Sequence, residues 1–281
     1  MAVANVAWRL AAKGLRVAVV DWNFAAPGVH YFLPVPGSDE PSVKGLVDYF
    51  EDWKVALDTD APSAPDFAKC VQVPRKEPLA GFLSVVLGTR TDINAAARLG
   101  KIDWSEFYEV DHGGGCVETL RARLIESHDV VLVDTESGVT TANGVSLVQL
   151  PDAVVYMSTL TARGLAGVLR TVRCVKEASA EERAGRPLAV TWLVIGRAPT
   201  TRDSEAWLHE HVGAICKDPV WSGTSVLVLP EVSRWAVGEH VVPVDVFDAV
   251  ALGYDDLAGR ISAWLKEPAS LDGKEVEAHK Q

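Results

Sequence analysis

The sequence predicts an α/β protein with a doubly wound, mostly parallel sheet and helices on both faces. Short apolar runs rich in β-branched residues alternate with helical patterns along the chain. The runs are apolar throughout, as expected of strands that are covered on both faces. With 281 residues, the chain is long enough to bury a large core.

The first expected elements are a helix over residues 2–13 and an apolar strand over residues 16–21, which ends in Asp21. A helix followed by a buried strand that ends in an aspartate is typical of the second half of a nucleotide-binding βαβ unit. The first half, a strand and a glycine-rich phosphate loop, would stand just before Met1. We therefore expect a domain that is incomplete at its N-terminal side.

The later elements follow the same alternation. Asp103 and Glu106 fit a capping box at the start of one helix. Residues 58–78 are rich in proline and are expected to form an insertion loop. One domain is expected over residues 1–265, followed by a polar, disordered tail over 266–281. The remaining strands are expected at 82–87, 130–134, 153–158, 189–195 and 225–229, and the helices at 43–53, 103–110, 116–127, 162–178, 204–212 and 246–265.

Composition favours a cytoplasmic protein without a membrane span. The 27 Lys and Arg against 38 Asp and Glu give a net charge of −11, which argues against nucleic acid or anionic lipid as a partner. The four cysteines lie far apart, as expected of buried free thiols in a reducing compartment. No run is apolar for long enough to cross a bilayer, and no leader pattern is present.

The first candidate site follows the strand at 130–134, which ends in Asp134 and continues as Thr135-Glu136-Ser137-Gly138. A strand-end aspartate of this kind can hold magnesium beside a phosphate loop. A glycine four positions later can bring its N–H against a terminal phosphate, because no side chain blocks the approach. A plain turn at the strand end is the structural alternative.

The second candidate site is Asp21 with the residues that follow it, Asn23 and the Pro27-Gly28 turn. A strand-end aspartate before a rigid turn suits a loop that is held over a ligand. Taken alone, the same aspartate could hold the ribose of a dinucleotide.

Together these segments resemble the MinD/ParA-like group of P-loop NTPases, the SIMIBI ATPases with a deviant Walker A loop. The resemblance covers most of residues 1–160 and includes Asp103-Trp104 and Gln149-Leu150-Pro151-Asp152. It implies ATP and Mg²⁺ binding, dimerisation around nucleotide, and hydrolysis that acts as a switch for a protein partner. It also implies a role for each candidate residue. Asp21 and Asn23 would be catalytic residues of switch I, impaired by the asparagine, and Asp134 would be the Walker B carboxylate that holds magnesium through water. The nucleotide-binding residues would be Asp134, Thr135, Pro27, Gly28 and Gly138, the last as the switch II glycine.

The chain departs from that group in two places. The Lys-Gly-Gly-type Walker A loop would end just before Met1, and Asn23 and Ala25 stand where acidic residues are usual. An amide cannot accept a proton from an attacking water as a carboxylate can. We therefore expect weak ATP binding, or none, in residues 1–281.

Three functions remain open from the sequence. The favoured one is an ATPase whose first strand is missing from this chain, because loss of that strand would leave edges unpaired in the middle of the sheet. The second is a nucleotide-free protein-interaction module with the same fold. The third is a truncated NAD(P)- or FAD-binding Rossmann oxidoreductase, which explains residues 1–21 equally well.

Overall fold

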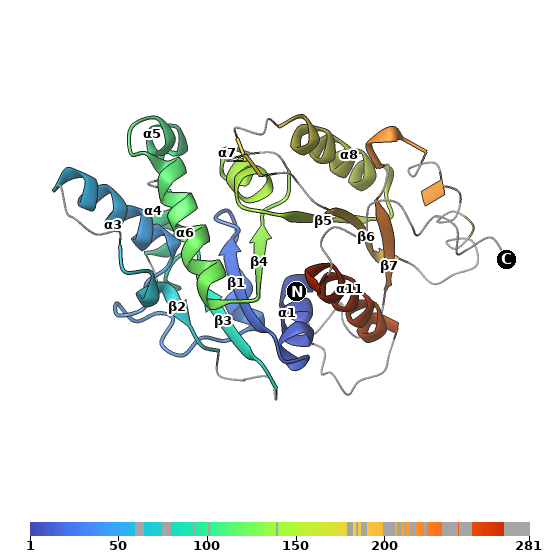
Figure 1. Cartoon of the computed structure of the whole chain (residues 1–281), viewed down its shortest axis with the longest axis horizontal. Helices are drawn as coiled ribbons and strands as arrows, with labels where there is room; N and C mark the ends of the chain where they lie inside the picture. The colour runs from blue at the N-terminus through green and yellow to red at the C-terminus, as the bar shows by residue number, and fades with distance from the viewer. Residues whose placement is uncertain are drawn as a thin grey trace. The chain divides into compact units, whose positions relative to one another are not determined.

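A computed structural model of the chain shows two compact units, Met1–Leu150 and Pro151–Gln281 (Figure 1). The structure describes residues 1–59, 65–74, 80–92, 94–100, 102–138, 140–178, 190–198, 217–221, 224–231 and 249–266, with a few further positions between 182 and 241. Each unit is described by itself. The expectation of a single domain over residues 1–265 stays a prediction.

Unit 1 is built around a four-stranded sheet of order β2-β3-β1-β4. The strands β1 (Arg16–Trp22), β3 (Phe82–Val86) and β4 (Val130–Thr135) are parallel, and β2 (Val71–Gln72) is antiparallel to β3. The helical elements are α1 (Ala2–Ala12), α2 (Val29–Phe32), α3 (Leu46–Asp58), η1 (Phe67–Cys70), α4 (Ala95–Leu99), α5 (Trp104–Glu109), α6 (Gly113–Ser127), α7 (Thr141–Gly144) and the π-helical turn η2 (Val145–Gln149).

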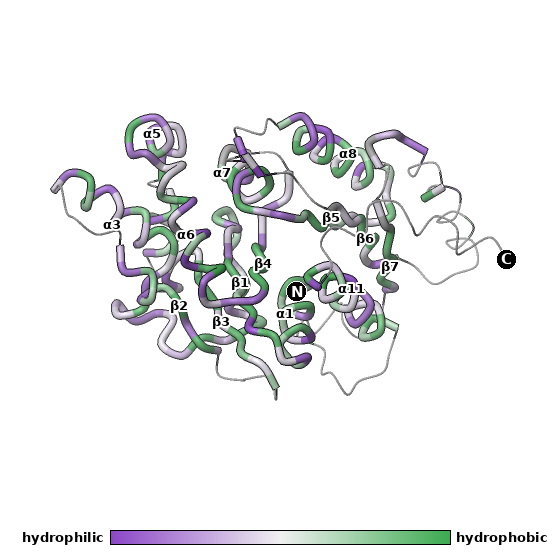
Figure 2. Tube along the Cα trace, viewed as in Figure 1, coloured by the Kyte–Doolittle hydropathy of each residue, from purple (hydrophilic) through white to green (hydrophobic). Residues whose placement is uncertain are grey.

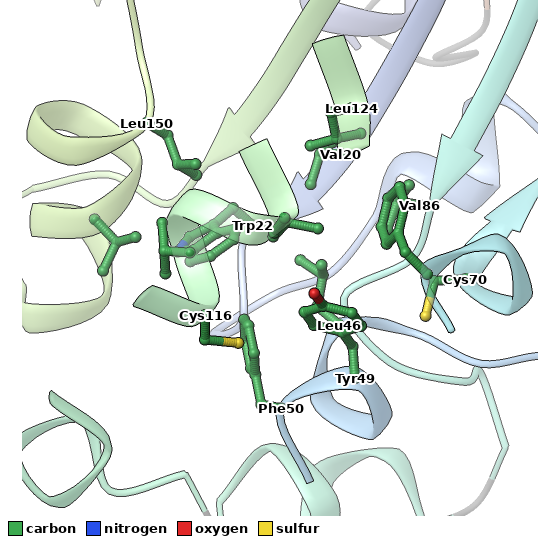
Figure 3. Packing of buried hydrophobic residues seen from close by; sticks show 14 of the residues in the cluster. Val20, Trp22, Leu46, Tyr49, Phe50, Cys70, Val86, Cys116, Leu124 and Leu150 are labelled. Carbon is green, nitrogen blue, oxygen red and sulfur yellow. The ribbon is translucent and has the colours of Figure 1, made fainter. Parts of the chain in front are cut away.

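Side chains of β1 alternate between two covered faces. Ala18, Val20 and Trp22 belong to a buried cluster with residues of α3 and α6, several of which Figure 3 labels. Val17 and Val19 are equally buried and point to the other face, and α1 packs against β1, β3 and β4. The sheet of unit 1 therefore carries helices on both sides, as the sequence predicts.

β4 forms one edge of this sheet among the described residues. It pairs with β1 alone, and its residues from Val131 to Thr135 are only half-buried, whereas β1 is buried from Val17 to Trp22. The sequence of β4 is Val-Val-Leu-Val-Asp-Thr, a composition typical of an interior strand. β4 therefore has the composition of an interior strand but lies at an edge of the described sheet.

Unit 2 contains a parallel three-stranded sheet of order β5-β6-β7, formed by β5 (Ala153–Thr159), β6 (Val190–Ala198) and β7 (Ser225–Pro230). The other elements described in this unit are α8 (Ala162–Glu177), the turn η3 (Pro219–Trp221) and α11 (Ala249–Lys266). Figure 2 shows hydrophobic and hydrophilic residues alternating along α8, which buries Val172 and Val175. None of the helices described in either unit is both long and apolar enough to cross a membrane.

Most expected elements are confirmed, with differences in their bounds. The helix expected at 43–53 runs from Leu46 to Asp58. The helix expected from residue 116 begins at Gly113, because its first turn packs closely against α5. The insertion at 58–78 contains η1 and the short strand β2, because its end pairs with β3. The helix expected at 204–212 and the tail at 266–281 lie, apart from isolated positions, outside the described residues.

Candidate functional site

Asp21 and Asp134 lie side by side at the carboxyl ends of β1 and β4, where they are register partners. Both side chains point to the face of the sheet on which α1 packs. Val20 and Trp22, on either side of Asp21, and Val133, before Asp134, face the cluster of α6 instead. The two carboxylates that the sequence singles out are therefore brought together at one edge. Ligands of parallel α/β sheets bind at this edge.

The protonation of both carboxyls reflects this crowded position. Asp21 is fully buried, and burial, with a smaller contribution from the neighbouring Asp134 carboxylate, raises its pKa from 3.8 to about 6. Burial also raises the pKa of Asp134, while the amino group of Met1 lowers it in part. The site therefore disfavours two negative charges unless a cation is present.

The carboxylate of Asp21 closes the loop that follows β1. It accepts hydrogen bonds from the backbone N–H groups of Asn23 at 3.3 Å, Gly28 at 3.0 Å and Val29 at 3.1 Å. Both oxygens are thus engaged in holding the loop. In this structure Asp21 has the geometry of a positioning group for residues 23–29.

Asn23, Pro27 and Gly28 lie within this loop. The Asn23 side chain accepts a hydrogen bond from the Ala26 N–H at 3.0 Å, which makes it part of a local turn. Gly28 precedes α2 with φ −147°, and an added Cβ would meet its neighbours only at 3.7 Å or more. The backbone of the loop therefore does not require glycine at this position.

The loop after β4 carries Thr135 and Gly138. Gly138 has φ +95°, a conformation that favours glycine, and an added Cβ would meet no described atom within 4 Å. The Thr135 hydroxyl donates to the Glu136 carbonyl at 3.3 Å. Gly138 therefore presents an open backbone face near the end of β4.

The first turn of α1 faces the same edge, because the Met1 amino group acts on Asp134. The helix has no side-chain cap and no acidic residue in its first turn. The N-terminal end of a helix carries a partial positive charge, which suits an anion. The acidic pair and the α1 terminus thus place opposite electrostatic features at one edge.

Magnesium fits Asp134 as one ligand among several. Among the residues that the structure describes, no group of three or more His, Cys, Asp or Glu side chains could hold a metal ion. Mg²⁺ is commonly held by one or two carboxylates, waters and substrate phosphates, so a complete protein cage is not required. The half-buried carboxylate of Asp134 is compatible with that arrangement.

Two residues that the sequence did not indicate, Trp22 and Asn143, hold the loops of this site. The Trp22 indole N–H donates to the Ala142 carbonyl at 3.0 Å, and the Asn143 side-chain amide donates to the carbonyls of Glu136 and Gly138. An asparagine five residues after the loop glycine was a weak signal. Nothing in the local sequence indicates the contact between Trp22 and Ala142.

Comparisons with known proteins identify the fold. No protein-family model and no curated protein matches the sequence. Solved structures do match: cobyrinic acid a,c-diamide synthase of Mycobacterium smegmatis with an ATP analogue and magnesium aligns with TM-score 0.61 and 16% identity, over 95% of this chain and 89% of that chain. An ATP complex of Cyanothece McdA, with one residue substituted, gives TM-score 0.60 and 16% identity, over 95% of this chain and 90% of that chain.

MinD of Aquifex aeolicus aligns with TM-score 0.56 and 14% identity, over 93% of this chain and 90% of that chain. Identities this low show the fold alone, and these alignments span nearly the whole chain. The parallel sheets, the paired aspartates at one sheet edge and the structural neighbours agree. The chain has the fold of the MinD/ParA-like P-loop NTPases.

Proposed function

We propose that this chain is the body of a MinD/ParA-like ATPase that acts as a nucleotide-dependent switch. The observation that carries the proposal is the pairing of Asp21 with Asp134 at the carboxyl edge of the sheet, next to the first turn of α1. Structural neighbours that contain ATP or magnesium support it. As residues 1–281, the chain binds Mg-ATP weakly or not at all.

The candidate residues take the following roles. Asp134 holds magnesium through water, and Thr135 and Gly138 lie toward the terminal phosphate. Asp21 holds the loop of Asn23, Pro27 and Gly28 in place. Asn23 cannot accept a proton from water as a carboxylate does, so turnover is slow.

The phosphate-binding part comes from a strand that pairs with the open edge of β4. The support is the apolar composition of β4, which is half-buried and has one described partner. An unpaired apolar edge exposes backbone donors and acceptors that a parallel strand would satisfy. We place this strand and a Lys-Gly-Gly-type loop in a segment outside residues 1–281.

The switch acts on a protein partner or on a second copy of the chain through the nucleotide face. One structural neighbour is the MinC:MinD complex of Aquifex aeolicus, and another is a plasmid partition protein from Borrelia burgdorferi. Cys70 and Cys116 are buried free thiols, which favours a cytoplasmic location.

The test compares residues 1–281 with the chain extended by the codons upstream of Met1. Calorimetry with Mg-ATP is expected to show binding only in the extended chain. In that chain, Asp134→Asn is expected to abolish the magnesium dependence, while Asp129→Asn, on the exposed surface, leaves it intact. Asn23→Asp is expected to increase turnover.

Other outcomes would reject the proposal. A stop codon directly upstream, or an upstream segment without a glycine-rich loop, would favour the nucleotide-free interaction module. A Gly-x-Gly-x-x-Gly segment without lysine would favour the oxidoreductase. Micromolar Mg-ATP binding by residues 1–281 would show that β4 needs no further strand for nucleotide binding.

A further inference from the structure

Trp22 connects the end of β1 to the first turn of α7. Its side chain is fully buried, and its indole N–H donates to the Ala142 carbonyl at 3.0 Å, across 120 positions of sequence. Figure 3 shows the Trp22 ring among the core residues of unit 1. A hydrogen bond made in the core is shielded from water, so the two ends are held firmly.

Asn143 connects the same turn of α7 to the Gly138 loop. Its side-chain nitrogen donates to the Glu136 carbonyl at 3.0 Å and to the Gly138 carbonyl at 2.9 Å. Two carbonyl acceptors fix the orientation of the amide, because only the nitrogen can donate. Asn143 follows Ala142 directly. Adjacent residues of α7 therefore form hydrogen bonds with the loop after β4 and with the indole of Trp22.

Trp22 also contacts the loop after β1, both through its neighbour in the chain and through its ring. The preceding residue, Asp21, holds the N–H groups of Gly28 and Val29. The following loop contains Phe24, whose ring lies 5.4 Å from that of Trp22 in an edge-to-face arrangement. A displacement of the indole would therefore act on both ends of residues 23–29.

We propose that Asn143 and Trp22 form a mechanical link between the two loops of the site. The path runs from Gly138 through the Asn143 amide and the Ala142 carbonyl to the Trp22 indole, and from there to residues 23–29. Both residues are positioning residues. The regulatory consequence, that a ligand at Gly138 changes the order of residues 23–29, rests on the proposed function.

One atom of the Asn143 side chain would gain a hydrogen bond if the amide moved to a different set of partners. The side-chain oxygen of Asn143 is buried and has no hydrogen-bond partner among the described residues. A buried acceptor without a donor is costly, so a shift that supplies a donor is favourable. The Asn143 amide is thus the part of the path that can change its partners.

A simpler interpretation is that the Trp22 hydrogen bond only satisfies a buried N–H group, as most buried tryptophans require. In that case, changes at Asn143 and at Trp22 have independent effects. A mechanical link instead makes the effect of Asn143 on residues 23–29 depend on the indole N–H. A double-mutant cycle separates the two interpretations.

The experiment measures backbone amide exchange in residues 1–281 without nucleotide, so its result does not depend on ATP binding. Asn143→Ala is expected to speed exchange at Gly28 and Val29 about fivefold, the change that one hydrogen bond of ordinary strength produces. In a Trp22→Phe background, Asn143→Ala is expected to produce no further change there. The matched controls are Asn94→Ala, at an exposed asparagine, and Trp104→Phe, in the same aromatic cluster.

Additive effects of the two changes would overturn the proposal. So would faster exchange confined to residues 137–143 in Asn143→Ala, with Gly28 and Val29 unchanged. Should Trp22→Phe fail to fold, Asn143→Ala alone decides, because the link requires a response at Gly28 and Val29 that Asn94→Ala lacks. A failure of the extended chain to bind ATP would reject the proposed function and leave this result standing.

Discussion

Replacing Asp21 by asparagine should change how the stability of the protein depends on pH. The fully buried carboxyl has a pKa of about 6 instead of 3.8, with burial as the largest cause. The native state therefore binds this proton more tightly than the unfolded chain does. Stability falls as pH rises between these two values, because ionisation is disfavoured in the folded protein.

The difference between the two pKa values corresponds to about 3 kcal/mol. Wild type loses this amount between about pH 4 and pH 7, whereas Asp21→Asn, which does not titrate, does not. The free energy of unfolding of the variant relative to wild type should therefore rise by about 3 kcal/mol across that range. The absolute difference at one pH also contains the cost of placing an amide N–H₂ near the Asn23 N–H, so the pH dependence is the diagnostic quantity.

The assay is urea unfolding of both proteins at a series of pH values, with Asp129→Asn as the control. Asp129 is partly exposed, and hydrogen bonds from Arg16 lower its pKa, so its contribution to stability is lost as pH falls. Because that loss occurs below the ordinary pKa of 3.8, the difference between Asp129→Asn and wild type should stay nearly flat over the pH range in which Asp21 titrates. A difference between Asp21→Asn and wild type that stays flat from about pH 4 to pH 7 would refute the burial of an ionisable Asp21.

Two further predictions concern α6 and its end. Gly113→Ala should lower the free energy of unfolding by about 1–3 kcal/mol, because an added Cβ would lie 2.4 Å from the Phe107 ring and 2.7 Å from its carbonyl oxygen. Gly115→Ala should raise the free energy of unfolding by about 0.5–1 kcal/mol, because the added Cβ would have nothing within 4 Å. Thermal unfolding in which Gly113→Ala is more stable than Gly115→Ala would contradict the close packing of Gly113 against Phe107. His128 is buried against Ser84, and burial lowers its pKa, so its contribution is present above its ordinary pKa and lost as pH falls. His128→Gln should therefore flatten the acid side of the stability profile, and an unchanged acid limb would count against a neutral buried imidazole.

Local chemistry was enough to predict most elements and the sheet edge at which Asp21 and Asp134 lie. The Asp103 side chain accepts hydrogen bonds from Ser105 and Glu106, as its place before a helix predicts. β1 was predicted to within one residue because a strand covered on both faces must be apolar. The glycines at 113–115 are poor helix formers, so the early start of α6 was missed; packing against α5 overrides their propensity.

The sequence by itself determined the alternation of strands and helices and the two strand-end aspartates, because both follow from side-chain chemistry at short range. Only the tertiary structure decided what those aspartates contact. The pairing of Asp21 with Asp134 and the hydrogen bond from Trp22 to Ala142 depend on β1 pairing with β4 and on α7 packing beside them. Contacts between residues more than a hundred positions apart arise from the pairing and packing of whole elements, which no local pattern encodes.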